Sequence, residues 1–153
     1  MIKICFVCLG NICRSPMAEF IMKKKVLELN LQEQFFITSR ATSYEESGND
    51  IYPPAKKKLS LENIPYAIHK ATRLEKTDYA QFDYFICMEQ ANVRNTLRIF
   101  EQEESDKVFR LFDITATKKD IADPWYTNNF DRTYKDLDEG IDFLIKYLLS
   151  NKL

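Results

Sequence analysis

The stretch that decides the fold is "KICFVCLGNICRSPMAEF", residues 3–20. It opens with an apolar run rich in β-branched and aromatic residues, continues through small and polar residues, and takes up helical spacing after Arg14. This order predicts a buried strand that ends near Val7, then a loop, then a helix. Ser15 is a residue type that caps helices and Pro16 suits a first helical turn, so we expect the helix to begin there.

The remaining sequence repeats this alternation. Apolar runs of strand length are separated by longer stretches with helical spacing, which predicts a parallel sheet covered on both faces. The expected strands are 2–7, 35–38, 82–88 and 107–112, and the expected helices are 16–29, 53–63, 89–100 and 133–149. No repeat or Gly/Ser-rich linker divides the chain, so residues 1–153 are interpreted as one doubly wound α/β domain.

Charge and composition exclude several classes of partner. The 22 basic side chains against 23 acidic ones give no overall field that would attract nucleic acid or a membrane surface. No apolar stretch approaches the roughly 20 residues of a membrane span, and the apolar start is too short for a secretory signal, so a cytoplasmic location is expected. Three of the four cysteines lie within the first 13 residues, which favours free thiols over a framework of disulfides. His69 is the only histidine and no second cysteine pair offers zinc ligands, so no metal or cofactor is expected.

The loop after the first strand is predicted to bind an anion. Backbone N–H groups at a helix N-terminus point toward the loop, and the helix dipole adds about half a positive charge. A nucleotide-binding loop would need GxxxxGK[ST], which is missing, whereas Arg14 can hold two oxygens of a phosphoryl group. The same environment stabilises a thiolate at Cys8. Gly10 and Asn11 are expected to provide the tight turn through positive φ.

"VCLGNICRSPMAE", residues 7–19, resembles the signature loop of the low-molecular-weight protein tyrosine phosphatases. "TSRATS", "GNDIYPPAKKKL", "HKATR", "FDYFICMEQANV" and "NNFDRTYKDLDEGID" follow in the family's order, so the resemblance spans nearly the whole chain. It implies a four-stranded sheet of order 2-1-3-4, with the site beyond the first strand. It also implies that Cys8 attacks phosphotyrosine to form a phosphocysteine while Arg14 binds the phosphate. The phosphate would then be surrounded by Leu9, Gly10, Asn11, Ile12, Cys13 and Ser15.

A second segment, "IADPWY", supplies a candidate general acid. Asp123 precedes Pro124, which biases it toward extended backbone in a loop, and two aromatic residues follow. "DPWY" resembles the family's general-acid loop, which implies that Asp123 protonates the leaving phenolate and then activates water. Trp125 and Tyr126 would line a cleft for a flat aryl group.

Further residues acquire expected roles from the same resemblance. It implies a hydrogen-bond network of Asn11, Ser15, Ser39 and His69 that shapes the loop. Cys13 is either a packing residue or a thiol that captures an oxidised Cys8 as a disulfide. Glu45 and Glu46 stand where family members often carry an aromatic residue or Asn on the cleft wall. They are either a solvated loop or a selector for basic phosphopeptides.

Four alternative functions compete with hydrolysis of phosphotyrosine. A related arsenate reductase passes oxidation to a further pair of cysteines, but beyond the loop only Cys87 remains. A related protein-arginine phosphatase typically has Thr at the position of Ile12. A phosphocysteine carrier has no need of Asp123, and a non-catalytic binding module should have lost Cys8 or Asp123. We therefore expect a metal-free hydrolase of phosphotyrosine proteins or small aryl phosphates that is a monomer or a weak dimer.

Overall fold

A four-stranded parallel sheet in the order β2-β1-β3-β4 forms the centre of the computed structural model, which describes residues 1–151. The strands are β1 (Ile2–Cys8), β2 (Phe35–Ala41), β3 (Tyr84–Cys87) and β4 (Val108–Arg110). Cys8 pairs with Ala41 of β2, and Val7 pairs with Cys87 of β3. The carboxyl ends of these three strands therefore meet at one edge, and the predicted strand order is confirmed.

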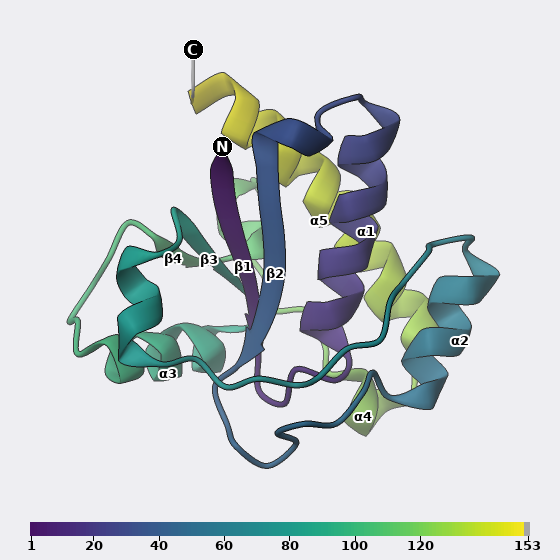
Figure 1. Cartoon of the computed structure of the whole chain (residues 1–153), viewed down its shortest axis with the longest axis horizontal. Coiled ribbons are helices and arrows are strands. Elements are labelled where there is room, and N and C mark those ends of the chain that lie inside the picture. The colour runs from purple at the N-terminus through teal and green to yellow at the C-terminus, as the bar shows by residue number, and fades with distance from the viewer. Residues whose placement is uncertain (152–153) are drawn as a thin grey trace.

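Helices cover both faces of the sheet. The α-helices are α1 (Arg14–Glu28), α2 (Pro53–Leu61), α3 (Gln90–Phe100), α4 (Pro124–Thr127) and α5 (Phe130–Asn151), with short 3-10 helices at η1 (Gln32–Gln34), η2 (Lys76–Ala80) and η3 (Leu111–Ile114). Figure 1 shows α1 and α5 on one side of the strands, α3 on the other, and α4 beyond the end of β1. None of the helices within residues 1–151 has the length and apolar character needed to cross a membrane.

The central strand β1 is buried on both faces. Ile4 and Phe6 pack into a cluster with residues of α1 and α5, whereas Cys5 and Val7 pack into a second cluster that includes Phe100 of α3. Strands of this kind read as continuous apolar runs because neither face meets water. The apolar opening of the sequence is thus explained by two hydrophobic cores that share one strand.

The predicted start of the first helix was wrong. Helix α1 begins at Arg14, and Cys13 occupies the N-cap position without a side-chain hydrogen bond. Ser15 lies inside the first turn, where its Oγ is 3.0 Å from Cys8 Sγ. Ser15 therefore does not cap the helix. Its hydroxyl contacts the thiol of Cys8 and not a backbone N–H of the first turn.

Candidate active site

The loop between β1 and α1 is held from outside through its carbonyl groups. Backbone N–H groups of the surrounding chain donate to them, and His69 Nε2 lies 2.7 Å from the Asn11 carbonyl oxygen. The backbone donor–acceptor pairs are Thr42 to Cys8 (3.0 Å), Ser43 to Leu9 (3.1 Å) and Tyr52 to Ile12 (2.9 Å). Because the carbonyl groups are bonded outward, the loop amides face inward, as an anion-binding loop requires.

The tight turn of the loop is made by Asn11. Its φ is 61°, in the left-handed region, and its backbone N–H donates to Cys8 Sγ at 3.3 Å. Gly10 does not have positive φ, so that part of the expectation was wrong. A Cβ on Gly10 would lie 3.4 Å from Cγ of Glu46, an ordinary van der Waals distance, so the space beside the loop does not itself require a glycine.

A directed network of hydrogen bonds ends at Cys8. Asn11 Oδ1 accepts from the Thr72 N–H at 3.1 Å, which orients the amide so that Nδ2 donates to Ser15 Oγ at 2.8 Å and to Ser39 Oγ at 3.0 Å. Since Ser15 Oγ accepts from Asn11, its own hydroxyl proton is available to Cys8 Sγ. The structure thus brings Asn11, Ser15 and Ser39 together under the thiol.

Glu19 belongs to this network although the sequence reasoning did not single it out. Ser39 Oγ donates to its Oε1 at 2.6 Å, and Lys23 Nζ lies 2.6 Å from its Oε2. The spacing in the sequence could have identified Glu19, because it follows Ser15 by four residues on α1 and the two side chains therefore share one face of the helix. His69 contacts the backbone of Asn11 and not the thiol, so it steadies the left-handed turn.

Arg14 is buried and held by three groups. Its Nη1 donates to the Ile121 carbonyl at 2.8 Å, and its Nη2 lies 3.3 Å from Asp123 and 3.4 Å from Glu89. Burial disfavours its charge, but the negative charges of Cys8, Asp123 and Glu89 outweigh this and raise the pKa of Arg14. Glu89 was also missed by the sequence reasoning. It follows β3 closely, at the sheet edge where β1 ends.

Asp123 stands immediately before α4, in the extended conformation expected of a residue that precedes proline. Its Oδ1 accepts from the Trp125 N–H at 3.0 Å, and its Oδ2 faces Arg14. The single helical turn of α4 was not expected from the sequence. It orients the carboxylate by placing the Trp125 amide beneath it.

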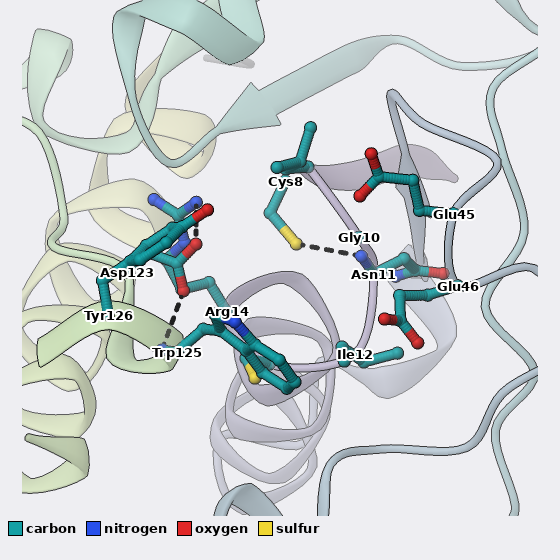
Figure 2. A pocket seen from close by; sticks show the side chains of 12 residues that line it. Cys8, Gly10, Asn11, Ile12, Arg14, Glu45, Glu46, Asp123, Trp125 and Tyr126 are labelled. Carbon is teal, nitrogen blue, oxygen red and sulfur yellow. Dashed lines mark hydrogen bonds and ion pairs between the residues drawn. The ribbon is translucent and has the colours of Figure 1, made fainter. Parts of the chain in front are cut away.

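A pocket opens above the loop and is lined by most of the predicted site residues. Ser15, which was expected to surround the phosphate, does not line it, and neither do Ser39 and His69. Figure 2 shows Asp123 on one side of the pocket and Glu45 and Glu46 on the other, with Cys8 between them. Trp125 and Tyr126 are 52% and 77% exposed, so they form the outer wall. The lining residues are Cys8, Leu9, Gly10, Asn11, Ile12, Cys13, Arg14, Glu45, Glu46, Asp123, Trp125 and Tyr126.

All four cysteines are free thiols. Cys13 is the last residue of the loop and is only 5% exposed, and burial, followed by the nearby charges of Cys8 and Asp123, raises the pKa of its thiol. Cys13 is therefore a neutral thiol at neutral pH, in contact with a hydrophobic cluster of Ile12 and Ala71. Cys8 and Cys13 both line the pocket, but the N–H of the left-handed Asn11 donates to the sulfur of Cys8.

The fold and the site define a cysteine-dependent phosphatase: a thiol within an anion-binding loop, a buried arginine, and a carboxylate across the pocket. Residues 3–152 match the sequence model of the low molecular weight phosphotyrosine protein phosphatases. The chain belongs to this family, whose members are hydrolases.

Relatives and solved structures agree with this assignment. The chain is 38% identical to the low molecular weight protein-tyrosine-phosphatase PtpA of Staphylococcus saprophyticus, over 99% of this chain and 96% of that protein. It resembles the crystal structure of a low molecular weight protein tyrosine phosphatase from Streptococcus pyogenes with a TM-score of 0.88 and 38% identity, covering 97% of this chain and 93% of the other. It also resembles YfkJ from Bacillus subtilis with a TM-score of 0.95 and 29% identity, covering 100% and 98%.

Proposed function

We propose that this chain hydrolyses phosphotyrosine in proteins, and small aryl phosphates, through a phosphocysteine on Cys8. In the first step the Cys8 thiolate forms an S–P bond while the P–O bond to the aryl group breaks. The aryl oxygen takes the proton of the Asp123 carboxyl group, so a neutral phenol leaves. Arg14 and the loop amides bind the phosphoryl oxygens throughout, where negative charge is spread in the transition state.

The second step returns the enzyme to its starting state. Water attacks the phosphorus atom of the phosphocysteine and gives one proton to the Asp123 carboxylate. The S–P bond breaks, inorganic phosphate leaves, and Cys8 becomes a thiolate again. A hydrogen bond from Ser15 and one from the Asn11 amide stabilise that thiolate as it departs.

One observation carries this proposal: Cys8 Sγ accepts from the Asn11 N–H, lies 3.0 Å from the Ser15 hydroxyl, and lines the same pocket as the Asp123 carboxylate. A phosphocysteine carrier would gain nothing from that carboxylate. An arsenate reductase relay would need more cysteines near the loop than Cys87, which is buried in β3. The apolar Ile12 in the pocket favours an aryl phosphate over a phosphoarginine, because the related protein-arginine phosphatases typically have Thr at this position.

The rim of the pocket suggests the preferred substrates. Glu45 and Glu46 line it on the side opposite Asp123, so basic residues beside the phosphotyrosine would be favoured. The protein would act in the cytoplasm, in keeping with its free thiols, as a monomer or a weak dimer.

The test is hydrolysis of p-nitrophenyl phosphate at about pH 6 with EDTA, comparing the parent with Cys8→Ser and Asp123→Asn. We expect the parent to turn over, Cys8→Ser to be inactive, and Asp123→Asn to be slower by about 100-fold or more. An inactive parent that still binds phosphate would overturn the proposal in favour of a carrier or a binding module.

A further inference from the structure

We propose that Tyr52 is a positioning residue for the general acid: its ring holds Trp125, and the Trp125 amide holds the Asp123 carboxylate. The inference rests on the proposed function, in which Asp123 donates the proton to the leaving group. Tyr52 itself does not line the pocket, so it acts through its neighbours and not on the substrate.

Tyr52 is anchored to the phosphate-binding loop. Its backbone N–H donates to the Ile12 carbonyl at 2.9 Å, and its ring packs on the cluster of Ile12 and Cys13. It lies immediately before Pro53, which keeps its backbone extended, with φ −56° and ψ 131°. The position of the ring is therefore fixed relative to the loop that binds the phosphate.

The ring of Tyr52 reaches across to the acid loop. Its centroid lies 4.8 Å from that of Trp125 with the planes at 53°, and 6.2 Å from that of Phe130 at the start of α5. Within residues 1–151, the only aromatic ring packed against Trp125 is that of Tyr52. Because the indole is 52% exposed, its orientation depends strongly on this contact.

The short helix α4 transmits the contact to the acid. It has only four residues, and a single helical turn has little stability of its own, so packing sets its orientation. Trp125 contributes both the ring that packs on Tyr52 and the N–H that donates to Asp123 Oδ1 at 3.0 Å. Removing the Tyr52 ring would therefore loosen the carboxylate while leaving Cys8 and its network in place.

The kinetic consequence depends on the leaving group. A basic phenolate needs the proton in the transition state, whereas a good leaving group such as p-nitrophenolate needs it less. For Tyr52→Leu we expect kcat/KM for phenyl phosphate to fall on the order of 10-fold, and that for p-nitrophenyl phosphate by about 2-fold. Tyr52→Phe keeps the ring and should behave like the parent. Trp125→Leu removes the other ring of the pair, so it should also lose more activity on phenyl phosphate than on p-nitrophenyl phosphate. This variant replaces Tyr52→Leu in the test if Tyr52→Leu does not fold.

Three controls separate positioning from a general loss of structure. Tyr84→Leu removes a similar aromatic pair, with Phe109 at 5.9 Å, at the amino end of β3, and it should not change the ratio of the two substrates. Inhibition of Tyr52→Leu by inorganic phosphate should match that of the parent. Combined with Asp123→Asn, the Tyr52→Leu change should have no additional effect on that ratio.

The outcomes are distinguishable. Equal losses on both substrates in Tyr52→Leu, or weaker inhibition by phosphate, would overturn the positioning role while leaving the proposed function intact. If Asp123→Asn itself fails to change the ratio, the acid of the proposed function is wrong and the inference falls with it.

Discussion

At the scale of single residues, two carboxylates determine the charge of the pocket rim. Glu46 lies with its stem against Gly10 of the phosphate-binding loop, and Glu45 is exposed beside it. Neither has an ion-pair partner among residues 1–151. An uncompensated carboxylate next to a bound phosphopeptide attracts a basic flank and repels an acidic one.

We therefore predict that phosphotyrosine peptides with arginine flanks are hydrolysed faster than those with aspartate flanks. The expected ratio in kcat/KM is about 5-fold, since an exposed ion pair contributes up to about 1 kcal/mol, and added salt should reduce it. The double variant Glu45→Gln, Glu46→Gln should abolish the preference. The matched control Glu103→Gln, Glu104→Gln, in the exposed loop between α3 and β4, should keep it. Equal rates on both peptides in the parent would contradict the prediction.

The site was predictable from sequence where the chemistry is local. Cys8, Arg14 and the loop between them lie within one strand, one turn and one helix, so spacing and residue type identify them together. Glu19 and Glu89 were missed because their roles depend on tertiary contacts: one reaches a serine of β2, and the other follows a strand that pairs with β1 only in the folded sheet.

At the scale of elements, α5 packs closely against η3. Gly140 of α5 lies against Leu111, where an added Cβ would be 2.6 Å from Leu111 Cδ2 and 2.8 Å from its Cγ. Leu111 is fully buried and cannot swing into solvent. The glycine is thus required by the approach of the helix, although it is a poor helix former.

We predict that Gly140→Ala lowers the free energy of unfolding by up to about 2 kcal/mol. The gain of about 1 kcal/mol in helix propensity is outweighed by the cost of about 1–3 kcal/mol for overpacking a filled core. Urea denaturation would measure the difference. In a Leu111→Ala background, which makes room for the methyl group, the same substitution should be neutral or stabilising. A Gly140→Ala protein more stable than the parent would show that propensity alone governs this position.

The elements themselves were predictable from periodicity, whereas their ends were not. The start of α1 was misplaced because Ser15 carries the residue type of a cap, but the site uses its hydroxyl. Helix α4 was missed because its four residues are too few for any periodic pattern. Asp123 is its N-cap and Pro124 is its first residue, a position that proline favours.

At the scale of the whole molecule, three buried thiols lie away from Cys8 in the hydrophobic clusters. Cys5 and Cys87 lie in the core that α3 covers, and Cys13 of the loop lies in a small cluster with Ile12 and Ala71. Burial raises the pKa of Cys5 and Cys13, and raises that of Cys87 to about 12. In the unfolded chain these thiols would titrate near their ordinary pKa of about 8.5.

This difference predicts a loss of stability in mild alkali. Above about pH 8.5 the unfolded chain releases protons that the folded protein keeps on its buried thiols, so the free energy of unfolding falls as pH rises. For Cys87 the loss continues until the folded-state pKa of about 12 is reached. Between about pH 7.5 and 9.5, each buried thiol should lower the free energy of unfolding by about 1 kcal/mol. This pH range lies below the one in which the lysines of the unfolded chain titrate. Urea denaturation with a reductant present would measure the loss. In Cys87→Ala the loss of unfolding free energy over this range should be smaller by about 1 kcal/mol, because one proton fewer is released on unfolding. If the parent and Cys87→Ala lose stability equally over this range, the buried Cys87 thiol is not what makes folding sensitive to alkali.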